Sequence, residues 1–149
     1  MDKKVKYIPD GYHTITPYLT VGEPDALIEF LSRAFGGELR YKHADEHGRT
    51  RHAEVQVGDS RVMIGGARGE WKPQPAMLYL YLPDCDAFYQ RALDAGAKSL
   101  QPPATHFYGD RTAGVQDASG NLWWIGTHVE DVSDEEIARR AQLPENQRA

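Results

Sequence analysis

The sequence has a single cysteine, no long apolar run and no excess of positive charge. Because Cys85 is alone among 149 residues, an intramolecular disulfide and cysteine-based zinc or iron–sulfur sites are excluded, and a reducing, cytoplasmic location is expected. No apolar stretch approaches the roughly 20 residues of a membrane span. Lys and Arg number 17 against 22 Asp and Glu, and the resulting net charge of −5 argues against nucleic acid and membrane surfaces as partners. What remains is an acidic, soluble chain of one-domain length.

The first half of the chain predicts a strand, a helix and three more strands. Residues 14–21 are rich in threonine and β-branched residues, which favour a strand. A helix follows from Pro24 to Gly36, with Leu27, Leu31 and Phe35 on one face. The other predicted strands span residues 38–44, 50–57 and 61–64, and a glycine- and proline-rich linker covers 65–75.

The second half predicts the same order of elements. A strand at 77–82 precedes a helix at 84–95, a short strand at 98–101 and a hairpin of strands 111–116 and 122–127. Beyond residue 132, Ser133 and Glu136 form a capping box that predicts a short, charged C-terminal helix.

Residue identities repeat along with the elements. Residues 51–56 (RHAEVQ) match residues 111–116 (RTAGVQ) at four of six places. Asp25-Ala26 and Ile64-Gly65 recur 61 positions later as Asp86-Ala87 and Ile125-Gly126. Three matches in nearly one register indicate a duplication. The predicted fold class is therefore α+β, with two tandem βαβββ modules over residues 11–66 and 75–132 and a helical tail over 133–149.

Paired βαβββ modules resemble the vicinal oxygen chelate superfamily, which includes glyoxalase I, bleomycin-resistance proteins and extradiol dioxygenases. Several segments are similar to its PhnB-like branch: residues 17–19, 34–38, 52–54, 108–111 and 117–132. Ala118 departs from this pattern, because proline is usual there. The resemblance covers residues 11–132 and implies a single domain with a cup-shaped mixed sheet. It also implies a homodimer that binds a small molecule.

The same resemblance allows a test for a metal site. Superfamily enzymes carry metal ligands on the first and last strands of each module, and these places correspond to Thr16, Met63, Met77 and Trp124. None is a His, Glu, Asp or Cys, the groups that hold catalytic divalent metals. The sequence therefore predicts a protein without a metal or other cofactor.

Strand alternation predicts which side chains face the cup. Ile15, Leu19 and Val21 are expected to pack on the helices. The following residues are expected to line a ligand pocket: Thr16, Tyr18, Gln56, Met63, Met77, Tyr79, Tyr81, Gln116 and Trp124, with Tyr108 in a loop at the pocket mouth. Aromatic faces with a few polar groups are typical of a small-molecule pocket, and they could stack on planar or cationic ligands. The alternative is that some of them, Met63 and Met77 above all, only fill the interior.

His52 and Glu54 lie on one face of a predicted strand. They are candidates for an acid–base pair, or Glu54 fixes the tautomer of His52 in a structural role. Two functions follow, beside the possibility of a structural or regulatory module with a filled cup. The first is metal-independent binding that sequesters an aromatic or peptide-like antibiotic. The alternative is a glyoxalase- or dioxygenase-type enzyme, a lyase, isomerase or dioxygenase, that uses a displaced metal or the His52–Glu54 pair.

Overall fold

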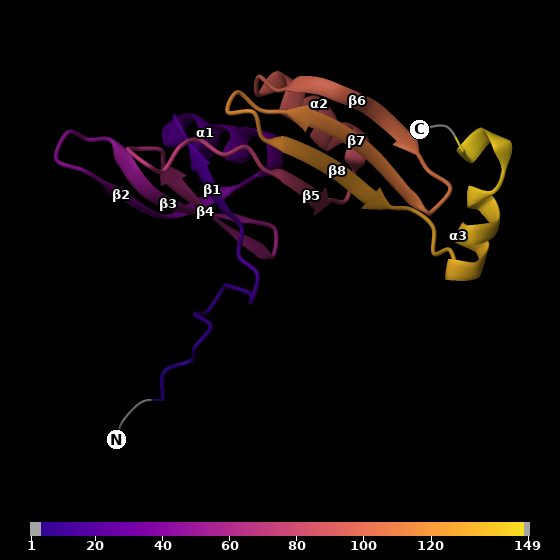
Figure 1. The fold of residues 1–149 in the computed structure, drawn as a ribbon, viewed down its shortest axis with the longest axis horizontal. Helices are drawn as coiled ribbons and strands as arrows, with labels where there is room; N and C mark the ends of the chain where they lie inside the picture. Colours follow the sequence, from indigo (N-terminus) through magenta and orange to yellow (C-terminus); the bar gives the residue numbers. More distant parts are fainter. Residues whose placement is uncertain (1–3, 148–149) are drawn as a thin grey trace. The chain divides into compact units, whose positions relative to one another are not determined.

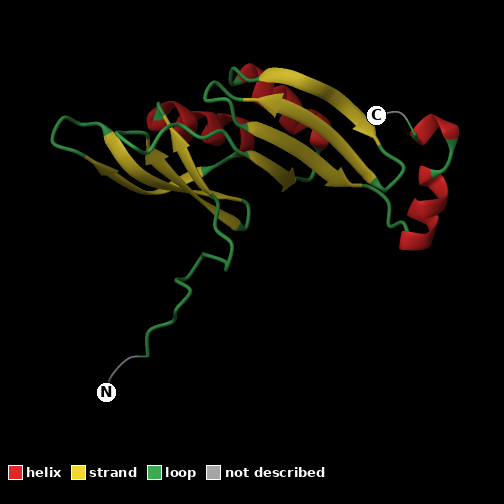
Figure 2. Ribbon diagram, viewed as in Figure 1, coloured by secondary structure: helices red, strands yellow, loops and turns green. Residues whose placement is uncertain are grey.

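The computed structural model describes residues 4–147, which form two units with the same order of elements (Figures 1 and 2). The first unit comprises the described residues up to Ala76 together with Ala118–Gly120, and the second comprises the rest, from Met77. The α+β fold of two tandem βαβββ modules is confirmed, and each module builds its own four-stranded mixed sheet. No helix in residues 4–147 has the length and apolar character to span a membrane.

The first unit consists of β1 (Tyr18–Val21), α1 (Pro24–Phe35), β2 (Glu38–Ala44), β3 (Thr50–Val57) and β4 (Ser60–Gly66). The strand order is β1-β4-β3-β2, with β1 parallel to β4 and the other neighbours antiparallel. Helix α1 packs on β3 and covers one face of this sheet. The N-terminal segment lies against the opposite face, which carries Glu54 and Met63.

The second unit repeats this topology. It consists of β5 (Met77–Tyr81), α2 (Cys85–Asp94), β6 (Lys98–Thr105), β7 (Asp110–Gln116) and β8 (Leu122–His128), in the order β5-β8-β7-β6. Helix α3 (Asp134–Ala141) and a short 3₁₀ helix, η1 (Pro144–Asn146), follow. As the capping box predicts, the Ser133 hydroxyl accepts a hydrogen bond from the backbone N–H of Glu136. Residues 148 and 149 of the predicted tail lie outside the described residues.

The repeated residues are those that pack the two sheets onto their helices. Val55 and Val115 occupy corresponding places in β3 and β7, and Ile64 and Ile125 in β4 and β8, and none is more than 1% exposed. Register repeats as well, because Leu19 pairs with Ile64 as Leu80 pairs with Ile125. The two units have therefore kept the same core residues at these positions since the duplication.

Two repeated glycines lie on the opposite face of the sheets. A Cβ atom on Gly65 would lie 2.5 Å from the hydroxyl oxygen of Tyr18, and one on Gly126 would lie 2.6 Å from that of Tyr79. Each tyrosine ring therefore lies directly across the β4 or β8 strand, where only glycine leaves room. In both units, therefore, a tyrosine ring packs over a glycine on the sheet face opposite the helix.

Two predicted strands were wrong in their bounds, and one residue was wrong in its expected packing. β1 begins at Tyr18 and not at residue 14, and Ile15 is 85% exposed instead of packed on a helix. Pro17 has no N–H for a sheet ladder, and the Thr16 hydroxyl donates to the carbonyl of His13 (2.9 Å), so the segment turns locally. β6 extends to Thr105 through two prolines, which is possible because it is an edge strand.

The predicted linker is also more ordered than expected. β4 continues to Gly66, and the backbone of Arg68 pairs with that of Trp71 in an isolated antiparallel bridge. A second bridge joins Gln74 to Thr20 of β1. Residues 67–74 are therefore a loop fastened to the first sheet.

Candidate functional site

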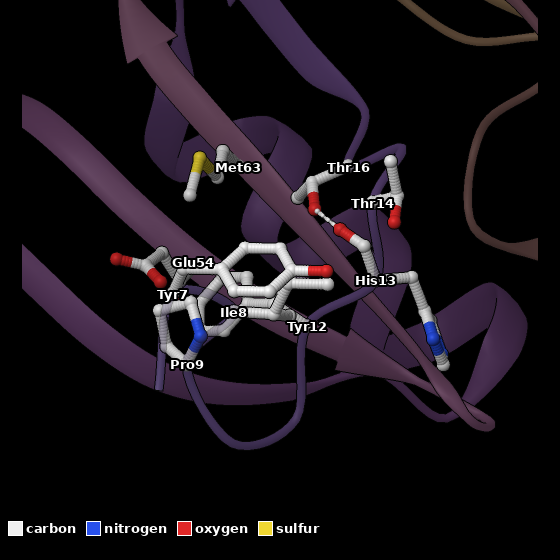
Figure 3. Close-up of a pocket in the computed structure, with 9 residues that line it drawn as sticks. All are labelled: Tyr7, Ile8, Pro9, Tyr12, His13, Thr14, Thr16, Glu54 and Met63. Carbon is white, nitrogen blue, oxygen red and sulfur yellow. Dashed lines mark hydrogen bonds between the residues drawn. The ribbon is translucent and has the colours of Figure 1, made fainter. Parts of the chain in front are cut away.

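A cavity of about 500 Å³ lies in the first unit, between the N-terminal segment and the open face of its sheet (Figure 3). The sheet contributes Glu54 from β3 and Met63 from β4. The N-terminal segment contributes the rest of the lining: Tyr7, Ile8, Pro9, Tyr12, His13, Thr14 and Thr16. We call this space the Glu54 cavity.

Arg61 of β4 holds the N-terminal segment in place. Its guanidinium carbon lies 4.8 Å from the centre of the Tyr12 ring, and its Nη1 donates to the Tyr12 hydroxyl (3.3 Å). Its Nε donates to Oε1 of Gln56 (2.8 Å). Gln56, which the sequence places among the ligand-binding residues, therefore supports Arg61 and does not line the Glu54 cavity.

The carboxylate of Glu54 lies between two groups that carry or can carry positive charge. His52 Nε2 is 3.2 Å from Oε2 of Glu54, and Nη1 of Arg61 is 4.0 Å from Oε1. The Glu54 side chain is only 14% exposed. Tyr18 lies beside this pair, with its ring centre 5.7 Å from that of His52. The arrangement suits both an acid–base pair and a carboxylate that fixes the imidazole.

The second unit carries a different polar cluster at its open face. Asp110 is 6% exposed, and its Oδ2 accepts hydrogen bonds from the hydroxyls of Tyr79 (2.9 Å) and Tyr81 (2.8 Å). Nδ1 of His128 lies 2.9 Å from Oδ1 of Asp110, and its Nε2 lies 2.7 Å from Asp131. Because both ring nitrogens face carboxylates, these contacts favour the protonated imidazolium, which can donate to both.

Comparison with known proteins now identifies the family. The model of the glyoxalase/bleomycin resistance protein/dioxygenase superfamily matches residues 11–125. The chain belongs to this superfamily. Among its relatives are uncharacterized proteins of Mycobacterium bovis and Mycobacterium tuberculosis. Each is 28% identical over 134 residues, which is 83% of this chain and 88% or 79% of the relative.

Solved structures of other proteins share the fold. TioX from Micromonospora sp. ML1 is 25% identical with a TM-score of 0.68, covering 78% of this chain and 99% of TioX. A PhnB protein from Bacillus cereus, described as a putative 3-demethylubiquinone-9 3-methyltransferase, has a TM-score of 0.63 at 16% identity, covering 77% and 99%. At this identity the likeness shows that the two proteins share the fold.

The four superfamily metal positions have donors unsuited to a catalytic divalent metal. Thr16 and Met63 line the Glu54 cavity with a hydroxyl and a thioether, and Met77 and Trp124 in the second unit offer a thioether and an indole. Within residues 4–147 there is no group of three or more His, Cys, Asp or Glu side chains that could hold a metal ion. The donor set therefore does not fit the metal that the superfamily implies.

The cluster around Asp110 shifts the pKa values of its members. Burial opposes ionisation of Asp110 most strongly, but hydrogen bonds from His128, Tyr81 and Tyr79 outweigh it and lower its pKa. Burial, followed by the Asp110 carboxylate, raises the pKa of Tyr79. The hydrogen bond to Asp110, followed by that to Asp131, raises the pKa of His128 above its ordinary value of 6.5.

The His128 shift predicts a pH-dependent stability. The folded chain binds the His128 proton more tightly than the unfolded chain does. The contribution of protonated His128 to the free energy of unfolding is therefore complete below pH 6.5, and it is lost as the pH rises through the higher pKa of the folded state. We expect the difference in free energy of unfolding between the wild type and His128→Gln to be largest near pH 5.5 and to shrink towards about pH 9. Urea denaturation at a series of pH values measures it. A difference that stays constant with pH contradicts this assignment.

The remaining predicted site residues lie in the second unit. The indole of Trp124 lies across Gly114, where a Cβ atom would collide with it. Tyr108 stacks on His106 at 5.2 Å between ring centres, and Nε2 of His106 lies 2.8 Å from the Thr112 hydroxyl. Met77 and Gln116 occupy the first place of β5 and the last place of β7.

Sequence reasoning missed four functional candidates: Tyr12, Arg61, Asp110 and His128. Asp110 and His128 stand inside the segments that carry the PhnB-like resemblance, so a signal for them was present without an assigned role. Tyr12 had no such signal, because the segment before Thr14 has no periodic pattern.

Proposed function

We propose that this protein binds an aromatic or peptide-like small molecule without a metal, and that it sequesters an antibiotic of this kind. The observation that supports the proposal is the Glu54 cavity. Its volume of about 500 Å³ falls within the range of ligand pockets, roughly 300–1,000 Å³. Its walls are mainly aromatic and aliphatic, with one carboxylate to fix the orientation of a ligand.

The negative charge of Glu54 favours a ligand that carries a positively charged group. Arg61 approaches Glu54 only to 4.0 Å, because its Nε and Nη1 are engaged by Gln56 and Tyr12. An ammonium group on the ligand would form a charge-assisted hydrogen bond with this half-enclosed carboxylate. The rings of Tyr7 and Tyr12 would contact the aromatic or peptide body of the same molecule.

Calorimetric titration with bleomycin and with an anthracycline, a planar antibiotic that bears an amine, tests the proposal. We expect at least one of the two to bind, and Glu54→Gln to weaken that binding about tenfold by removing the charge-assisted bond. Glu29→Gln is the matched control, because Glu29 is exposed on α1 and lies outside the cavity. Absence of binding by both compounds at millimolar concentration, or equal affinities in all three proteins, contradicts the proposal.

The enzymatic alternative has its own supporting observation, the 3.2 Å contact between His52 and Glu54. Metal analysis of the protein used for titration separates the two functions. One stoichiometric divalent ion per chain would overturn metal-independent binding and favour a displaced metal. Sequestration, the cytoplasmic location and the homodimer implied by the resemblance stay predictions.

A further inference from the structure

A second cavity of the first unit shares no lining residue with the Glu54 cavity. Its volume is about 280 Å³, and its walls are Arg51, Arg68, Trp71, Tyr18, Thr20 and the backbone of Gly65 and Gly66. We call it the arginine cavity. Two guanidinium groups and two aromatic rings line it, and no acidic side chain does.

The loop over residues 67–74 gives this cavity a fixed wall. The N–H of Ala67 donates to Val21 (2.8 Å), and that of Gln74 donates to Thr20 (3.0 Å), so both ends of the loop are fastened to β1. Between them, Arg68 and Trp71 exchange two backbone hydrogen bonds of 2.9 and 2.8 Å. Residues paired in this way project from the same face, so the guanidinium and the indole stand side by side.

The two arginines retain unused hydrogen-bonding capacity. Arg68 makes no ion pair within residues 4–147, and the indole of Trp71 is 72% exposed. Nη2 of Arg51 pairs with Asp45 (2.6 Å), but its buried Nε–H donates to no acceptor among the described residues. A buried donor without an acceptor is uncommon, because leaving it unpaired costs free energy. Because this Nε atom is buried, it adds to the positive charge beside the cavity and does not itself reach a ligand.

We propose that the arginine cavity is a binding site for a flat aromatic carboxylate. The guanidinium fork of Arg68 matches the two oxygens of a carboxylate, and the Arg51 guanidinium, which also lines the cavity, adds positive charge. The rings of Trp71 and Tyr18 take the aromatic part of the ligand. Since Asp45 neutralises only one of the two arginines, the cavity keeps a net positive charge that selects an anion.

Calorimetric titration with three probes tests this site. We expect 1-naphthoate to bind the wild type at least tenfold more tightly than neutral 1-naphthalenemethanol or acetate, because only naphthoate carries both the charge and the ring. Arg68→Gln should weaken naphthoate binding at least tenfold. Arg40→Gln should leave it unchanged, because Arg40 is exposed on β2, outside the cavity, and pairs with Glu38.

The position of the probe is checked by NMR. The indole N–H signal that disappears in Trp71→Phe should be the one that shifts when naphthoate is added to the wild type. Equal affinity of Arg68→Gln and the wild type, equal binding of the neutral probe, or shifts confined to the other indoles would overturn the site. Because the two cavities share no residue, that result would leave the proposed function at Glu54 untouched.

Discussion

Replacing Asp117 by alanine is expected to lower the free energy of unfolding by about 4 kcal/mol. Asp117 closes the turn between β7 and β8. Its Oδ1 accepts a hydrogen bond from the backbone N–H of Asn121 (3.0 Å). Its Oδ2 accepts two more, from the side-chain amide of Asn121 (3.0 Å) and from the indole N–H of Trp123 (2.8 Å). Asn121 is 0% exposed and Trp123 is 1% exposed, so water cannot readily replace the lost acceptor. The substitution removes three hydrogen bonds to a carboxylate at once, each worth about 1.5–3 kcal/mol and not fully additive.

Urea denaturation followed by far-UV circular dichroism measures this loss. Asp59→Ala is the matched control, because Asp59 lies in the corresponding β3–β4 turn of the first unit but is exposed and bonds only to neighbouring Ser60 through its side chain. We expect the control to change stability by less than about 0.5 kcal/mol. An Asp117→Ala protein within about 1 kcal/mol of the wild type would show that the network is not the anchor of this turn.

The sequence predicted the core because packing constrains residue identity at both copies of a position. Val55 with Val115, and Ile64 with Ile125, face the helices of their units, and a change of size there is felt throughout a close-packed interior. Alternation of buried and exposed residues, together with turn residues, located the strands of both hairpins. The α+β fold and the repeat therefore followed from local patterns alone.

The open faces could be predicted only in part, because duplication has not kept their residues. Glu54 and Met63, paired across β3 and β4, correspond to Gly114 and Trp124, paired across β7 and β8. Alternation placed Glu54 and Met63 on the same face and Met63 in a ligand pocket, but it did not indicate that the N-terminal segment forms the opposite wall. That cavity depends on a segment without regular structure, whose position is set by the contact between Tyr12 and Arg61, 49 residues apart.

A second large loss of stability is expected from substitution of Gly109, which lies in the loop before β7. Its φ of +101° is a conformation that L side chains rarely adopt, and a Cβ atom there would collide with the backbone carbonyl oxygen of Glu130. The carbonyl of Gly109 also accepts the N–H groups of Val129 (2.8 Å) and Glu130 (3.1 Å), which hold the loop beside the end of β8. Backbone strain and the collision together should make Gly109→Ala about 3 kcal/mol less stable than the wild type.

Gly48→Ala separates the two causes, because Gly48 has a φ of +78° but no atom within 4 Å of an added Cβ. It should cost only about 1 kcal/mol, the contribution of the backbone conformation alone.

The collision at Gly109 also has a functional consequence, since a shift of the loop draws adjacent Asp110 away from His128. We therefore expect the pKa of His128, measured by NMR titration, to fall towards 6.5 in Gly109→Ala and to stay raised in Gly48→Ala. Equal stability losses in the two variants, with an unchanged His128 titration, would show that the loop tolerates the added methyl group and that the Asp110 cluster does not depend on it.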